Sequence, residues 1–217
     1  MKRSFYLIAI DGGAGTGKST TASILSERLN FLHVDTGSHY RSITRHLLNL
    51  GVGPEEAEKY ININKLILSS EIEERKSKLS LDGKSFGKDQ LRSKEVNDMV
   101  SKFACLPALR NTLFNYQREQ VDLAQSHNFV GLVMEGRDIG TVIFPNADLK
   151  VFLHADPSVR ENRRKRDGES DEIASRDRQD KQRQVAPLKE SSGSLRIDTS
   201  ALGVEEVYDT IVTHLKR

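Results

Sequence analysis

The sequence predicts an α/β fold built on a doubly wound parallel sheet. Short apolar runs alternate along the chain with segments whose apolar residues recur at helical spacing. A glycine-rich loop at residues 12–19 follows the first of these runs and precedes the first helical segment. The 217 residues suffice for one substantial core with a small insertion. We therefore expect a single domain spanning residues 1–217.

The loop reads Gly-Gly-Ala-Gly-Thr-Gly-Lys-Ser, which is the spacing of a phosphate-binding loop (P-loop). Its glycines let backbone N–H groups turn toward an anion, and a helix that begins at Lys18 adds positive charge. The Ser19 hydroxyl is suited to a Mg²⁺ ion that bridges two phosphates. The alternative is a turn that only joins a strand to a helix, and eight matched positions in this context disfavour it. The loop predicts binding of a nucleoside triphosphate.

The first half of the chain continues the alternation. We expect strands at 5–10 and 31–34, and helices at 19–29, 38–50 and 55–69. Tyr40 and Arg41 lie in a first helical turn at the carboxyl end of a strand, where open α/β sheets bind ligands. For Tyr40, packing of the helix is an equally good explanation. Asp35 is either a functional residue or only the N-cap of that helix.

Residues 62–106 interrupt the strand and helix pattern. Alternation from 71 to 86 predicts a hairpin whose turn is Asp82-Gly83, and a helix follows at 94–104. The segment is short and both of its ends return to the core. We interpret it as an inserted subdomain, and we expect Cys105 at its end to be a core residue.

The second half resumes the alternation. We expect a helix from Pro107 to 126, a helix after Asp156-Pro157, a closing helix at 203–217, and strands at 129–134, 149–154 and 194–197. Arg137 and Asp138 directly follow a buried strand, so we expect them to be functional. Residues 160–183 are almost continuously charged. The exposed face of a helix is the alternative there for Arg160, Arg163, Arg164 and Arg166, and it is stronger for Arg163 and Arg166.

Composition excludes several classes of protein. A net charge of +2 favours neither nucleic acid nor a membrane as partner, and no apolar run approaches the length of a bilayer span. The single cysteine excludes an intramolecular disulfide and fits the cytoplasm. The six histidines lack the spacing of zinc ligands. An RNA-binding face at 160–183 is disfavoured because acidic residues interleave with the arginines and aromatic residues are absent.

The arginines exceed what one triphosphate needs. They are dispersed along the chain, and the set that we single out is Arg41, Arg110, Arg137, Arg176 and Arg183. Because guanidinium groups bind phosphates through two parallel hydrogen bonds, such a set predicts two phosphorylated ligands that face each other.

These features resemble the bacterial cytidylate kinases, a family of nucleoside monophosphate kinases. The resemblance covers nearly the whole chain and rests on the glycine loop, residues 35–41, Pro107 with Arg110, residues 135–145, residues 176–180 with Arg183, and residues 185–188. Thr36 stands where many relatives have serine, and Glu135 where some have aspartate. Both substitutions keep the functional group.

The resemblance implies a P-loop nucleoside monophosphate kinase fold, in which the insertion binds the monophosphate and a charged lid spans about 158–186. It implies transfer of the γ-phosphoryl group of ATP to CMP or dCMP, with Mg²⁺ as cofactor. Other small-molecule kinases, acting on UMP, AMP, shikimate or dephospho-coenzyme A, are the alternative. We expect a cytoplasmic monomer whose partners are nucleotides.

The resemblance also implies residue roles. ATP would be bound by Gly12, Gly13, Ala14, Gly15, Thr16, Gly17, Lys18, Ser19, Thr20, Arg160 and Arg164. The acceptor nucleotide would be bound by Thr36, Tyr40, Arg41, Ser101, Arg110, Arg137, Asp138, Arg176, Asp180 and Arg183. The catalytic groups would be Lys18, Arg137, Arg176 and Arg183, and Ser19 would bind the metal. The acceptor oxygen is already anionic, so no general base is expected.

Overall fold

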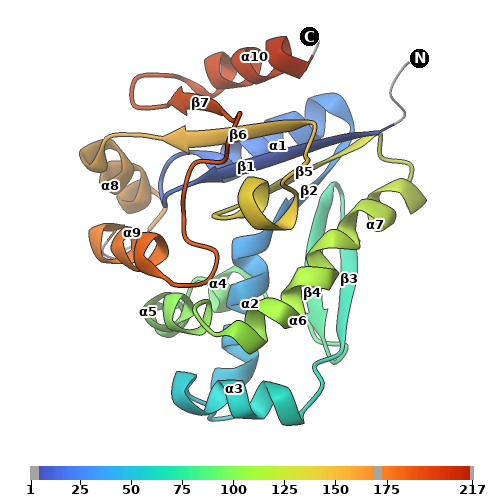
Figure 1. The fold of residues 1–217 in the computed structure, drawn as a ribbon, viewed down its shortest axis with the longest axis vertical. Coiled ribbons are helices and arrows are strands. Elements are labelled where there is room, and N and C mark those ends of the chain that lie inside the picture. The colour runs from blue at the N-terminus through green and yellow to red at the C-terminus, as the bar shows by residue number, and fades with distance from the viewer. Residues whose placement is uncertain (1–4, 169–172, 216–217) are drawn as a thin grey trace.

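The computed structural model describes residues 5–168 and 173–215, except for the side chains of Ala174 and Arg176. Its described strands form one seven-stranded sheet in the order β3-β4-β2-β5-β1-β6-β7 (Figure 1). The strands are β1 (Tyr6–Gly12), β2 (Phe31–Asp35), β3 (Leu68–Glu73), β4 (Lys76–Leu81), β5 (Gly131–Gly136), β6 (Leu149–His154) and β7 (Leu195–Asp198). Neighbouring strands are parallel except for β3 and β4. The predicted α/β class with a mostly parallel sheet is confirmed.

The helices pack on both faces and at one end of the sheet. They are α1 (Lys18–Leu29), α2 (Thr36–Asn49), α3 (Pro54–Ile63), α4 (Lys88–Leu91), α5 (Lys94–Phe103), α6 (Pro107–Arg118), α7 (Gln120–Ser126), the π-helical turn η1 (Ile139–Ile143), α8 (Pro157–Arg166), α9 (Ile173–Gln182) and α10 (Val204–Leu215). Figure 1 shows α10 and β7 at one end of the molecule and α3 at the other. Helices α8, α9 and α5 follow one another down one side.

Three apolar clusters hold these layers together. One joins β1, β5, β6 and β7 to α1 and α10, and includes Leu25, Val151 and Ile211. A second joins the opposite face of the sheet to α7 and η1. The third packs α2, α3, α5 and α6 against β4 around Phe103. The side chains of these clusters come from segments far apart in sequence. Their burial therefore holds the strands and helices in place, and with them the loops that follow the strands.

Asp82-Gly83 forms a two-residue turn as predicted, but it is not the turn of the main hairpin. The chain between β3 and β4 turns at Glu74-Arg75. The predicted helix 55–69 is shorter than expected: it ends at Ile63, and β3 begins at Leu68. Strand β4 must reach β2, with which Lys76 and Ser77 pair in parallel. The hairpin therefore extends the central sheet. Asp82-Gly83 forms a separate tight turn, with positive φ at both residues and a bridge between Leu81 and Lys84.

Cys105 is exposed, which corrects its prediction as a core residue. It lies in the turn between α5 and α6, where Phe103 and Ala104 take the buried positions. Among the residues that the structure describes, we find no helix that combines the length and the apolar character needed to cross a membrane.

Gly131 of β5 lies against the Phe31 ring, where there is no space for a side chain. A Cβ atom there would lie 2.5–2.7 Å from the buried Phe31 ring. We expect Gly131→Ala to lower the free energy of unfolding by about 1–3 kcal/mol, because the ring must shift within a packed core. Urea denaturation measures this change.

Gly53→Ala is the matched control, because nothing lies within 4 Å of a Cβ atom at Gly53. Its cost should stay below about 1 kcal/mol, the size of a helix-cap effect. Equal losses for the two variants would contradict the packing argument.

Candidate active site

The candidate site lies where β1, β2 and β5 end, at the carboxyl edge of the sheet. Strand β5 runs between the other two, so the residues that follow the three strands meet at one place. The glycine loop follows β1, Asp35 ends β2, and Arg137 follows β5. Arg137 and Asp138 thus lie at the carboxyl edge, directly after the buried strand β5.

The backbone of the glycine loop is held in a tight conformation by contacts within the loop and with α8. Gly15 and Gly17 have positive φ angles of 72° and 89°, and a Cβ atom at Gly15 would lie 2.8 Å from the Arg160 carbonyl oxygen. The Lys18 ammonium donates to the Gly13 carbonyl at 2.8 Å. Helix α1 begins at Lys18, so its N-terminal amides face the loop. The loop has the geometry of an anion cradle.

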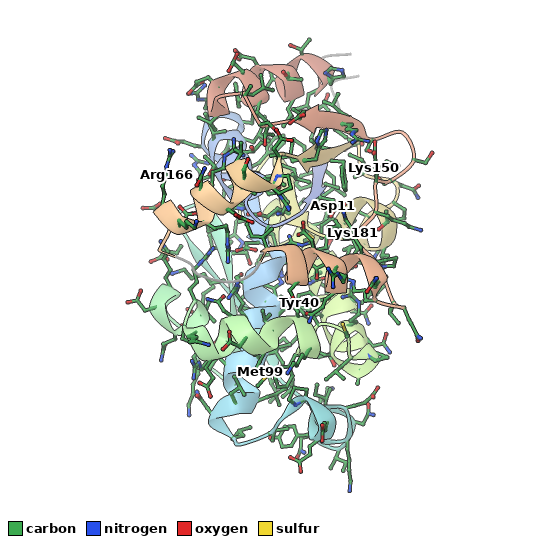
Figure 2. The ribbon with its side chains drawn as sticks, turned by 90° about the vertical axis from the view of Figure 1, so that its left-hand side faces the viewer. Asp11, Tyr40, Met99, Lys150, Arg166 and Lys181 are labelled. Atoms are coloured by element: carbon green, nitrogen blue, oxygen red, sulfur yellow. The ribbon has the colours of Figure 1, made fainter. Side chains whose placement is uncertain are left out.

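Helix α8 packs against this loop. The Arg160 guanidinium donates to the Ala14 carbonyl at 3.3 Å and to Asp177 of α9 at 2.6 Å. Arg163 donates to the Gly15 carbonyl at 3.3 Å and to the Thr199 carbonyl at 2.6 Å. Arg163 is thus bound to the loop and does not simply form an exposed helix face, whereas Arg166 is exposed (Figure 2).

The glycine loop and a group of arginines face each other across a cleft at this sheet edge. On the arginine side, carboxylates pair with the predicted arginines. Asp138 accepts from Arg110 at 2.5 Å and from Arg183 at 3.3 Å. Arg137 donates to Asp180 at 2.8 Å. The Arg110 guanidinium also lies 5.4 Å from the centre of the Tyr40 ring, and burial raises the pKa of Tyr40 to about 12. Tyr40 therefore stays neutral and supports Arg110.

These groups surround a cavity of about 60 Å³ between α2, α5 and α9. Its lining residues are Thr36, Gly37, Tyr40, Val100, Ser101, Ala104, Gly136, Arg137, Asp138, Asp180 and Arg183. In Figure 2, α9 crosses between the labelled positions of Asp11 and Tyr40. Arg176 lies in α9, but its side chain falls outside the part of the chain that the structure describes.

A second cavity, of about 170 Å³, connects the two sides. Lys18, Ser19, Thr20, Arg41 and Arg164 line it, together with Asp35, Arg92 and Glu135. Arg41 is held in place by donating to the Leu91 carbonyl at 2.9 Å and to Asn97 at 2.5 Å. Asp35 caps α2 by accepting from the Ser38 amide at 3.2 Å and also faces this cavity.

A third cavity, of about 290 Å³, lies beside the loop and was not predicted from the sequence. Gly15 and Thr20 form one wall, and Leu202, Val204 and Val207 at the start of α10 form another. The Thr199 hydroxyl joins the walls by donating to the Thr16 carbonyl at 3.0 Å. The sequence gives no signal for this cavity, because Thr199 and Leu202 lie nearly two hundred residues from the loop. It gives none for Arg92 of the second cavity either.

Ser19 and Glu135 are the groups best suited to a hard cation. The Ser19 hydroxyl donates to Glu135 Oε2 at 2.9 Å, and Asp35 lines the same cavity. Among the described residues, no cluster of three or more His, Cys, Asp or Glu side chains is arranged to hold a metal alone. Oxygen donors of this kind fit Mg²⁺ when bound phosphates supply further ligands.

Asp11 holds the turn that follows Asp138. Its carboxylate accepts from the Ile139 amide at 2.8 Å and from the Gly140 amide at 2.7 Å. Burial raises the pKa of Asp11 to about 6, although these two hydrogen bonds oppose the shift. Asp11 thus fixes the backbone that presents Arg137 and Asp138.

The chain is similar to known proteins over nearly its whole length. A family model described as cytidylate kinase matches residues 8–217. Cytidylate kinases from Thermotoga sp. (strain RQ2) and Exiguobacterium sp. (strain ATCC BAA-1283 / AT1b) are 37% and 38% identical. The first alignment covers 95% of each chain, and the second covers 97% of this chain and 96% of the relative.

A solved structure shares the fold. A gluconokinase from Sinorhizobium meliloti 1021 has a TM-score of 0.51 at 16% identity, and the match covers 100% of this chain and 94% of the gluconokinase. At this identity the likeness concerns the fold alone.

The raised pKa of Asp11 predicts a pH-dependent stability. The folded protein binds this proton more tightly than the unfolded chain does, so the stabilisation is complete below about pH 4 and is lost as the pH rises through about 6. Asp11→Asn cannot ionise. Its free energy of unfolding, relative to wild type, should therefore rise by about 2.4 kcal/mol between pH 4 and pH 7. Denaturant titrations at several pH values measure this difference, and a constant difference would contradict the assignment.

Proposed function

The chain belongs to the cytidylate kinase family and is a phosphotransferase of that kind, and we propose that its cleft binds ATP over the glycine loop and CMP beside Arg110. One observation carries this assignment of the two sides. The cavity beside Arg110 and the cavity beside Lys18 share Gly37, Gly136 and Arg137 as a common wall. A phosphate in one cavity would therefore face a phosphate in the other, as direct transfer requires.

On the acceptor side, we assign the phosphate of CMP to Arg41, Arg110, Arg137 and Arg183. Asp138 and Ser101 would bind the cytosine edge, because a carboxylate accepts from the exocyclic amine that cytosine presents. Asp180 would accept from the ribose hydroxyls. The present ion pairs support this proposal, because they show that the guanidinium groups converge and carry anionic partners.

On the donor side, Gly12 to Thr20 would hold the triphosphate of ATP, with Lys18 beside the migrating phosphoryl group. The third cavity would take the nucleoside, since it opens beside Gly15 and Thr20 and has an apolar wall. Arg160 and Arg164 of α8 and Arg176 of α9 would close the charged lid over the phosphates. The proposed lid spans about 158–186, and residues 169–172 of it lie outside the described part of the chain.

We assign Mg²⁺ to Ser19 and Glu135, whose oxygen atoms fit this ion. When bound, Mg²⁺ would neutralise charge on the triphosphate. The protein's own share of catalysis is to hold two polyanions in line and to exclude water. Because the transferred phosphoryl group passes through a loose transition state, cationic positioning does most of this work.

The proposal extends to dCMP as a second acceptor, since Asp180 alone is assigned to the ribose. It also places a monomeric enzyme in the cytoplasm, where the exposed thiol of Cys105 would stay reduced. The segment 62–106 would be the monophosphate-binding insertion, because it carries Ser101 and the partners of Arg41.

Phosphorylation of different acceptors tests the function. With Mg²⁺ and ATP, we expect the protein to convert CMP and dCMP faster than UMP, AMP or shikimate, as followed by ADP release. Arg110→Lys keeps the charge but loses the planar fork, so kcat/KM for CMP should fall about 100-fold, or about 2.7 kcal/mol. The KM for ATP should change less than about threefold, since Arg110 lies on the acceptor side.

Arg28→Lys is the matched control, because Arg28 pairs with Glu205 at the surface. A wild-type preference for another acceptor would overturn the proposed function. An equal effect of the two arginine substitutions would overturn the assignment of Arg110.

A substitution that fills the third cavity tests the donor side. Val204 lines this cavity and is 36% exposed, so Val204→Trp should fold while obstructing the space. We expect KM for ATP to rise about tenfold, which is about 1.4 kcal/mol, and KM for CMP to stay within twofold. Steady-state kinetics with each substrate varied in turn provide the measurement. Val130→Trp, at an exposed valine before β5, should leave both constants unchanged.

A further inference from the structure

Three hydrogen-bonded side chains lie behind the glycine loop. Ser19 donates to Glu135 Oε2 at 2.9 Å, and His33 Nε2 lies 2.9 Å from Glu135 Oε1. The side chains of His33 and Glu135 are only 4% and 3% exposed. His33 has no part in the roles assigned above, although it contacts one of the two proposed metal-binding residues.

The register of the sheet produces this contact. Asp35 of β2 pairs with Glu135 of β5, and His33 pairs with Val133. Side chains two positions apart on a strand face the same side, so His33 lies diagonally across from Glu135 on the face covered by α1. The contact therefore follows from strand pairing.

The Glu135 carboxylate is held by one partner at each oxygen, His33 at Oε1 and Ser19 at Oε2. The backbone of Glu135 is already fixed, because its carbonyl accepts from the Thr36 hydroxyl at 2.8 Å. The longer side chain still has rotational freedom, and a buried carboxylate requires a partner for each oxygen. Among the described residues, His33 Nδ1 has no hydrogen-bond partner, so the polar contact of this ring is with Glu135.

We propose that His33 is a positioning residue for the divalent cation, which acts by holding one oxygen of Glu135 so that the other stays beside the Ser19 hydroxyl. Because a carboxylate oxygen accepts, the imidazole donates to Glu135 from Nε2–H. The inference rests on the proposed function in one respect, namely that the cation arrives with the nucleoside triphosphate.

A purely structural pair is the competing explanation, and the cavities argue against it. Ser19, His33, Asp35 and Glu135 all line a cavity of about 430 Å³. Ser19 and Glu135 also face the cavity that contains Lys18. The pair thus borders the space where phosphates are proposed to bind, as groups that orient a metal ligand must.

The test compares substitutions that differ in one donor. His33→Gln keeps an N–H donor at nearly the reach of Nε2, whereas His33→Leu has similar volume and none. If His33→Leu does not fold, His33→Asn takes its place, because its amide is too short to reach Glu135. His39→Leu is the control, since His39 is also fully buried and its ring nitrogens have no hydrogen-bond partner among the described residues.

Binding of Mn²⁺ to each protein in complex with a non-hydrolysable ATP analogue gives a readout separate from turnover. The electron paramagnetic resonance signal of free Mn²⁺ measures its dissociation constant. We expect His33→Leu to weaken Mn²⁺ binding at least tenfold, His33→Gln to stay within about threefold of wild type, and His39→Leu to match wild type. KM for CMP should stay within twofold in His33→Leu.

Equal Mn²⁺ affinity in His33→Leu and His33→Gln, whether weakened or not, would overturn the inference. The Mn²⁺-binding result can be distinguished from a failure of the proposed function. If wild type fails to phosphorylate CMP, the proposed function falls while the Mn²⁺ comparison still decides the role of His33.

Discussion

The structure depends on pairing carboxylates with guanidinium groups at a buried sheet edge. Arg110 and Arg183 both contact Asp138, Arg137 contacts Asp180, and Arg160 contacts Asp177. Burial and the nearby Arg110 charge lower the pKa of Arg183, because both disfavour its charged form. Without the carboxylates, so many cations could not be buried together. The pairs therefore allow the cleft to exist before any nucleotide enters it.

The same pairs tie together segments that no local interaction joins. Asp138 follows β5, Arg110 belongs to α6, and Arg183 follows α9. Behind them, Asp11 at the end of β1 holds the amides after Asp138. The sheet thus supplies a rigid edge, and ion pairs dock α9 on it. A nucleotide phosphate that replaces a carboxylate partner would exchange one anion for another, so binding needs little rearrangement of charge.

The sequence predicts those parts of the site that depend on local residue spacing. The glycine loop, and Arg137 with Asp138 after a buried strand, were predicted because a motif or a strand end fixes their surroundings. The roles of Arg110 and Arg183 came from the family resemblance, and the structure brings both residues to Asp138. The third cavity, Arg92 and the contact of Arg163 with the loop depend on tertiary packing and leave no periodic signal. The turn of the main hairpin was missed for the same reason, since pairing with β2 decided where β4 begins.

Asp138 has a role in stability and a second role in the proposed function. In the structure it neutralises two arginines, whereas the proposed function requires it to accept from a cytosine amine. These demands are compatible because a carboxylate has about four acceptor positions, and Arg110 and Arg183 occupy different oxygens. A neutral amide would keep hydrogen bonding but would leave Arg110 without its counter-charge, and Arg183 would keep only Asp180, 3.9 Å away. The choice of an acidic residue thus follows from the arginines around it as much as from the base it is proposed to bind.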